Sequence, residues 1–77
     1  MGAGHDLTVA EWVEVLEEWH FACAYCGASK VPLQQEHMTP ISRGGLHSRW
    51  NVVPACGPCN SRKSTKTAGE FITESVL

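Results

Sequence analysis

The sequence lacks any long apolar stretch, which excludes a membrane-spanning helix of about 20 apolar residues. Its first residues include no basic segment followed by an apolar stretch and a small-residue cleavage site, so we expect no secretory signal and a cytoplasmic location. Apolar residues make up 43% of the chain and charged residues 18%. This composition does not indicate a disordered protein, and we expect a globular one.

The chain is also short, and its 77 residues suffice for only one core, so we predict a single domain over residues 1–77. A chain of this size buries only about 60% of the surface that its unfolded form exposes. Below about 80 residues, an apolar core rarely stabilises a fold alone, and natural domains add disulfides or a metal ion. The four cysteines are the candidates for this role.

Basic residues are scarce in the first half of the chain, and acidic residues are missing from the segment that follows. Residues 1–36 hold six acidic residues and one basic residue, Lys30, whereas residues 37–66 hold five basic residues and no acidic one. Such segregation suggests an acidic face and a separate basic face that could contact phosphates. The alternative is that the basic residues merely solvate a loop and a helix.

Thr8 and Glu11 form a capping-box pattern, which predicts the start of a helix over residues 8–20. Apolar residues recur in this segment at helical spacing, and we expect them to face the core with glutamates on the opposite side. These apolar residues are Val9, Trp12, Val13, Leu16 and Trp19.

Shorter elements are predicted for the rest of the chain. Alternating and β-branched residues favour two strands, and a Gly-Gly pair with many polar residues indicates a structured loop between them. A proline that suits a first helical turn and a second Thr-x-x-Glu pattern predict two further helical segments. The strands are expected at residues 31–38 and 52–56, the loop at 41–50, and the helices from Pro58 and from Thr67–Glu70.

The cysteines form two Cys-x-x-Cys pairs, Cys23 with Cys26 and Cys56 with Cys59. Two such pairs are typical of a tetrahedral zinc site, with each thiolate about 2.3 Å from the ion. Four protein ligands leave no position for water, so we expect this zinc to be structural. One alternative is two disulfides, which need an oxidising compartment. The other is a redox Cys-x-x-Cys, which needs a thioredoxin-like context that the sequence does not show.

Polar residues suited to hydrolysis lie between and just after the cysteine pairs. Glu36 and Asn60 offer hard oxygen ligands for Mg²⁺ or a similar ion, and His37 can take a proton from water near neutral pH. Phosphodiester hydrolysis needs such a base, a cation, and basic residues that hold the polyanion.

The order of these residues resembles the HNH endonuclease family over residues 23–63. The resemblance is carried by Glu36–His37, the loop from Pro40 to Gly45, Asn51 and the Cys-x-x-Cys-Asn segment. The chain is most similar to small HNH proteins with a four-cysteine zinc site that phages often carry. The resemblance implies an α+β fold with a ββα-metal (His-Me finger) motif, preceded here by the amphipathic helix. Its hairpin would surround the 41–50 loop and pack on the helix near Pro58.

The resemblance also implies a role for each site residue. His37 matches the general base, Glu36 the acidic metal ligand, and Asn60 the last signature residue, which supplies the other protein ligand to the catalytic ion. Asn51 matches the asparagine that braces the loop and so holds the histidine. The chain departs from the family in having Glu where Asp is more usual and Asn where the last His stands. This HNN variant favours Mg²⁺ or Mn²⁺ over Zn²⁺ as catalytic ion.

Together these features predict a metal-dependent DNA endonuclease or nicking enzyme of low sequence specificity, with Zn²⁺ as structural ion. We expect it to act in a bacterial or phage-infected cell, where a larger packaging or recombination complex could direct it, and away from membranes. The alternatives are a noncatalytic zinc module that binds nucleic acid and a zinc-stapled scaffold that binds a protein through its acidic helix. The candidate DNA contacts are Arg43, His47, Arg49, Arg62, Lys63 and Lys66.

Overall fold

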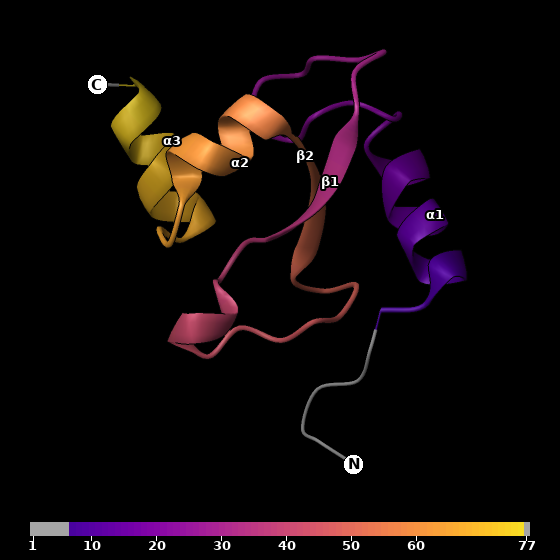
Figure 1. The fold of residues 1–77 in the computed structure, drawn as a ribbon, viewed down its shortest axis with the longest axis horizontal. Helices are drawn as coiled ribbons and strands as arrows, with labels where there is room; N and C mark the ends of the chain where they lie inside the picture. Colours follow the sequence, from indigo (N-terminus) through magenta and orange to yellow (C-terminus); the bar gives the residue numbers. More distant parts are fainter. Residues whose placement is uncertain (1–6, 77) are drawn as a thin grey trace.

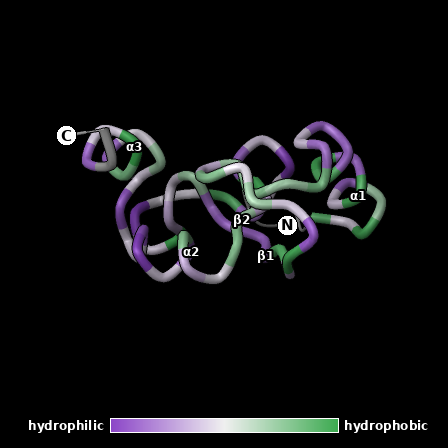
Figure 2. The backbone as a smooth tube through the Cα atoms, turned by 90° about the horizontal axis from the view of Figure 1, so that it is seen from above, coloured by the Kyte–Doolittle hydropathy of each residue, from purple (hydrophilic) through white to green (hydrophobic). Residues whose placement is uncertain are grey.

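A computed structural model describes residues 7–76 and shows a two-stranded antiparallel sheet between helices (Figure 1). One helix, α1, lies on one side of the sheet, and α2 and α3 lie on the other; the view from above in Figure 2 shows the same order. This arrangement confirms the expected α+β class. The elements are α1 (Val9–Glu18), β1 (Leu33–His37), the 3₁₀ helix η1 (Ile41–Arg43), β2 (Val52–Cys56), α2 (Gly57–Lys63) and α3 (Ala68–Val76).

The strands pair in a register that runs from Leu33 opposite Cys56 to His37 opposite Val52. All five residues of β2 are buried, whereas β1 buries only Glu36. The second strand is therefore the centre of the molecule. One end of this hairpin adjoins the cysteines, and the other end carries His37 and opens into the loop that contains η1.

Local capping signals place two of the helices. The Thr8 hydroxyl accepts a hydrogen bond from the Glu11 amide at 3.1 Å, and the Glu11 carboxylate accepts one from the Thr8 amide at 3.0 Å. Thr67 and Glu70 form the same reciprocal pair before α3. Both capping boxes expected from the sequence are thus present, and each satisfies backbone donors that the first helical turn leaves unpaired.

The prediction of which residues of α1 face the core is wrong in part. Val9 is 80% exposed, and Val13 and Trp19 are each 41% exposed, whereas Val15 is the buried residue of the helix. A helix packs with only the stripe that meets its neighbour, and here that neighbour is the narrow sheet at β2. Helical spacing therefore predicted an amphipathic helix correctly, but not which side of it would be covered.

The acidic and basic segments of the sequence do not form separate faces. Arg49 pairs with Glu14 and, at 2.8 Å, with Glu18, and so joins the loop before β2 to α1. Arg43 pairs with Glu70 at 2.7 Å, which joins η1 to α3. The expectation of two faces fails because folding returns the basic loop to the acidic helices.

Within residues 7–76, no helix is both long enough and apolar enough to cross a membrane.

Candidate active site and metal centre

The four cysteines form a compact cluster in which all four sulfur atoms lie within 4.8 Å of one another. Cys23 and Cys26 come from the turn before β1, Cys56 ends β2, and Cys59 lies in the first turn of α2. The Sγ atoms of Cys26 and Cys56 are 3.7 Å apart. This matches the edge of about 3.8 Å of a tetrahedron whose corners lie about 2.3 Å from a zinc ion. The donor set and its spacing fit structural zinc.

The turn around the first cysteine pair is shaped for sulfur ligands. Gly27 has a φ of 79°, a left-handed conformation that glycine adopts without strain. The Tyr25 amide donates a hydrogen bond to the Cys23 sulfur at 3.4 Å. Such backbone donors stabilise thiolates, which are the form of cysteine that binds zinc.

The pKa values of two cysteines in the cluster are shifted in opposite directions. Burial and the neighbouring sulfurs raise the pKa of Cys59 to about 12. Burial also acts to raise the pKa of Cys23, but hydrogen bonds from backbone amides outweigh it and lower that pKa to about 6. With this pKa, Cys59 keeps its proton near neutral pH, so zinc binding, which needs the thiolate, must release that proton.

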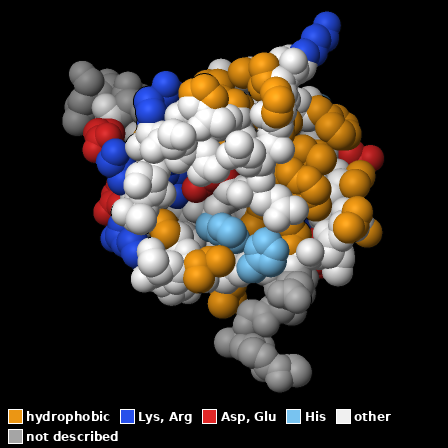
Figure 3. Space-filling view, in the orientation of Figure 1, with side chains coloured by type: hydrophobic (Ala, Val, Ile, Leu, Met, Phe, Trp, Pro, Cys, Tyr) orange, Lys and Arg blue, Asp and Glu red, His pale blue; other side chains and the backbone are white. Residues whose placement is uncertain are grey.

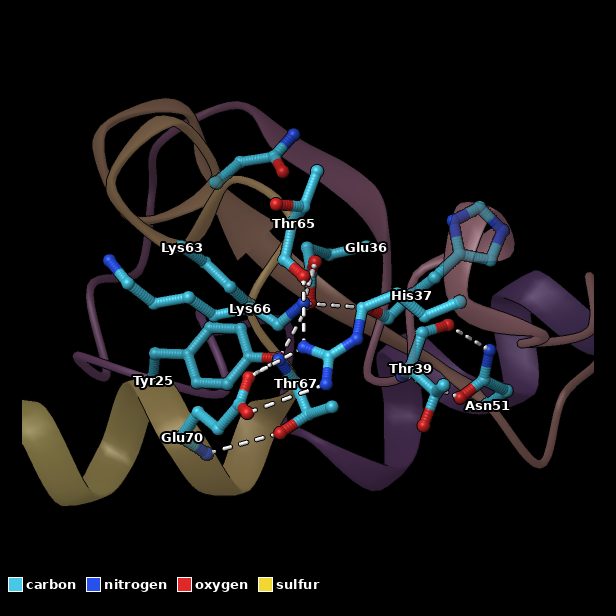
Figure 4. Close-up of polar contacts among 12 residues, drawn as sticks. Tyr25, Glu36, His37, Thr39, Asn51, Lys63, Thr65, Lys66, Thr67 and Glu70 are labelled. Atoms are coloured by element: carbon cyan, nitrogen blue, oxygen red, sulfur yellow. Dashed lines mark hydrogen bonds and ion pairs between the residues drawn. The ribbon is translucent and has the colours of Figure 1, made fainter.

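At the end of β1, Glu36 lies in a buried polar network (Figure 4). The Tyr25 hydroxyl donates to Glu36 Oε1 at 2.6 Å, and the Lys63 ammonium lies 2.7 Å from Glu36 Oε2. The same ammonium donates to the backbone oxygen of His37 at 2.8 Å. Burial, together with the hydrogen bond to Glu36 and the charge of Glu36, raises the pKa of Tyr25, which keeps it a hydrogen-bond donor. The network joins the turn of the first cysteine pair, which carries Tyr25, to β1 and α2.

The two expected ligands of the catalytic ion bind different partners across one interface. Glu36 faces Lys63, while one turn earlier in α2 the Asn60 side-chain amide donates to Gln34 Oε1 at 2.5 Å. The oxygen donors suit a hard ion, and Asn60 uses its nitrogen here, so its Oδ1 is the atom that could ligate a metal. Glu36 could join it only by sharing or releasing a contact, because each of its oxygens already has a partner.

Gln34 is a site residue that the sequence analysis missed. It lies two positions before Glu36 in β1, so both side chains leave the same side of the strand. Asn60 and Lys63 are three apart in α2, and residues at this spacing share a helix face. These two spacings, in the strand and in the helix, could have indicated from the sequence that Gln34 faces Asn60 where Glu36 faces Lys63.

His37 lies next to Glu36 and contacts a second histidine. His37 Nε2 and His47 Nδ1 are 2.9 Å apart, and the two rings are tilted by 52° with centroids 5.1 Å apart. Both residues are half-buried, and Figure 3 shows two histidine side chains side by side on an open face. Desolvation lowers the pKa of His37, as do the charges of His47 and Lys63, while Glu36 acts in the opposite direction. The ring is therefore neutral, and able to accept a proton, at pH 7.

Asn51 makes hydrogen bonds to two parts of the loop. Its Nδ2 donates to Thr39 O at 2.9 Å and to Leu46 O at 2.8 Å, while its Oδ1 accepts from the Thr39 amide at 2.9 Å. Gly45 fills the space between, where an added Cβ would lie 1.8 Å from Thr39 O. These bonds are of the bracing kind that the resemblance implies, while a part for Asn51 in catalysis stays a prediction.

Most of the expected DNA contacts already have acidic partners. Arg43 pairs with a glutamate of α3, and Arg49 pairs with glutamates of α1. Lys63 is fully buried against Glu36, and Lys66 lies 3.1 Å from Glu74. Arg62 differs, because it is exposed and its contact is a 3.4 Å hydrogen bond to the Cys59 sulfur. Binding of DNA by any of these residues stays a prediction.

The antiparallel hairpin followed by α2, with His37 at the end of β1, is the ββα arrangement of the His-Me finger class, and the four-cysteine cluster adjoins it. The model of the HNH endonuclease family matches residues 23–75, which is more than half of the chain. The chain therefore belongs to the HNH endonuclease family. A search of curated proteins finds no match.

Proposed function

We propose that this HNH domain hydrolyses phosphodiester bonds in DNA as a metal-dependent endonuclease or nicking enzyme. The observation that carries the proposal is the place of His37, a half-buried imidazole at the end of β1 whose pKa is lowered chiefly by burial, in a chain of the nuclease family. A general base has to combine access to solvent with a pKa near or below neutrality. His37 has both.

In this proposal, His37 takes the proton of the attacking water. The Asn51 hydrogen bonds keep the loop beside it in one conformation. A divalent ion, when bound, would neutralise charge on the phosphate and the leaving oxygen. Asn60 and Glu36 would hold it, and Glu36 would have to share or release its contact with Lys63.

Low sequence specificity follows from the type of contact that the surface offers. Within residues 7–76, Arg62 is an exposed cation on α2, beside the zinc cluster and one helical turn after Cys59. In this proposal Arg62 contacts phosphate oxygens, which are the same in every sequence. Bases would then contribute little to the choice of cleavage site.

One observation favours a second function, a zinc module that binds nucleic acid without cutting it. Glu36 is fully engaged by Tyr25 and Lys63, as expected of a structural residue rather than of a free metal ligand. If the ion pair cannot open, the domain keeps its fold and surface but holds no catalytic ion.

The decisive experiment is cleavage of supercoiled plasmid by the zinc-loaded protein. We expect nicked or linear DNA with Mg²⁺ or Mn²⁺, none with the zinc-loaded protein alone, and loss of about 10²- to 10⁴-fold in rate for His37→Ala. His20→Ala is the matched control, because His20 is an exposed histidine just after α1. Equal cleavage by wild type and His37→Ala would refute the catalytic proposal, and binding without cleavage would establish the second function.

A further inference from the structure

We propose that His47 is a positioning residue for His37: it accepts a hydrogen bond from His37 Nε2 and so leaves Nδ1 as the basic nitrogen. The inference rests on the proposed function in taking His37 as the general base. It also gives His47 a role other than the DNA contact expected from the sequence.

The geometry allows one proton between the two rings. His37 Nε2 and His47 Nδ1 are 2.9 Å apart, which is hydrogen-bond distance, and a neutral imidazole has one N–H and one acceptor nitrogen. If His47 donated, its proton would occupy the lone pair of His37 Nε2, and the other nitrogen of His37 would carry the hydrogen. That tautomer has no free lone pair and cannot act as a base.

The opposite arrangement gives a working base. When His37 donates from Nε2, its Nδ1 carries a lone pair that is free to take a proton from water. After proton transfer the ring is positively charged and still donates to His47, and a charged donor makes the stronger hydrogen bond. His47 would then hold the ring in the same orientation before and after the proton moves.

The backbone on both sides of His47 is fixed by one residue. The Asn51 side chain donates to Leu46 O at 2.8 Å, and the backbone N–H of Asn51 donates to Ser48 O at 2.9 Å. Ser48 is buried, with 3% of its surface exposed. Asn51 also pairs with the start of the loop at Thr39, two residues after His37. Asn51 thus holds the backbone on both sides of His47 and near His37, which keeps the two rings within reach of each other.

Nuclear magnetic resonance of the ¹⁵N-labelled, zinc-loaded chain tests the inference without any need for activity. At a pH where both rings are neutral, we expect the shared proton on His37 Nε2, with a scalar coupling across the hydrogen bond to His47 Nδ1. In His47→Asn, the amide oxygen should replace Nδ1 as acceptor and keep the ring ordered, and in His47→Ala the proton should exchange rapidly with water. A proton on His47 Nδ1 in the wild type would overturn the proposal.

Single-turnover cleavage with saturating protein supplies the second test. We expect His47→Ala to lower the cleavage rate by about 10- to 100-fold, as a misplaced catalytic group does, with the dissociation constant for DNA unchanged. His47→Asn should recover most of the rate, and His20→Asn should match the wild type. Weaker DNA binding with an unchanged rate would overturn the positioning role. If the wild type does not cut at all, the proposed function fails, and the resonance experiment still decides how His47 holds His37.

Discussion

The Lys63 ammonium lies 2.7 Å from Glu36 Oε2, and this buried ion pair joins α2 to β1. Lys63 is fully buried and Glu36 is 5% exposed. Charges in such a place are costly unless each neutralises the other, so loss of one partner leaves the other unpaired. Removing one partner of this pair should therefore destabilise the fold and disturb the geometry of the site.

Lys63→Met should lower the free energy of unfolding by about 3–5 kcal/mol, because it leaves the Glu36 carboxylate buried without its counter-charge. Lys66→Met is the control, since Lys66 pairs with Glu74 at the surface, and it should cost no more than about 1 kcal/mol. Urea denaturation at fixed free zinc measures both. Equal costs would mean that Glu36 does not depend on Lys63.

Replacing Cys56 by serine, or removing zinc with a chelator, should unfold the chain. The cysteine sulfurs lie within 4.8 Å of one another, and zinc binding energy is folding energy in domains of this size. Circular dichroism and zinc content report the outcome. A wild-type melting temperature without bound zinc would contradict the structural role of the ion.

Gly45→Ala should destabilise the protein and disorder its loop, because the new Cβ would lie 1.8 Å from the backbone oxygen of Thr39. Gly69→Ala is the matched control: nothing lies within 4 Å of its added Cβ, and it belongs to α3. Alanine is the better helix former, so that variant should gain about 0.5–1 kcal/mol. Thermal melts compare the two, and a neutral Gly45→Ala would show that the loop has room to move.

Arg62→Ala should weaken DNA binding for all sequences alike and reduce the salt dependence of binding by about one counterion. Arg43→Ala should have a smaller effect on affinity, because Arg43 is already paired with Glu70. Fluorescence anisotropy titrations at several salt concentrations distinguish these variants. A loss confined to one DNA sequence would show that Arg62 contacts bases.

Cleavage should stay active below the ordinary histidine pKa of 6.5. Desolvation and the charges of His47 and Lys63 lower the pKa of His37, so its neutral, proton-accepting form persists as pH falls. The rate should therefore rise with pH through a midpoint below 6.5 and then level off. Single-turnover rates at saturating Mg²⁺ measure this profile, and a midpoint clearly above 6.5 would require another group as base.

The features that could be predicted from sequence are those encoded by neighbouring residues. The capping box of Thr8 and Glu11 needs only a spacing of three, and each Cys-x-x-Cys pair is equally local. The positions of the strands and of α2 followed from such patterns and from the family resemblance. Local chemistry of this kind survives folding because it does not depend on the rest of the chain.

The features that could not be predicted depend on what the fold brings together. Val9 and Val13 have the spacing of core residues, but the two-stranded sheet is too narrow to cover them. Lys63 resembles a DNA-binding lysine in sequence, and only the packing of α2 on β1 reveals Glu36 as its partner. The contact of His37 with His47 likewise depends on the path of a loop.

The register of the hairpin links the position of His37 to the cysteine cluster at the other end of the strands. Leu33 lies opposite Cys56 at one end of the ladder, and His37 lies opposite Val52 at the other. A slip of β1 by one residue would turn every side chain to the other side of the strand, so Glu36 would leave Lys63 and His37 would leave His47. Zinc in the cysteine cluster would hold Cys56 at its end, and Asn51 accepts a hydrogen bond from the Met38 amide at the opposite end, so both ends of the ladder would be fixed. Oxidation of the cysteines or chelation of the zinc would thus separate His37 from His47 through a change in β1, although neither treatment acts on the histidine directly.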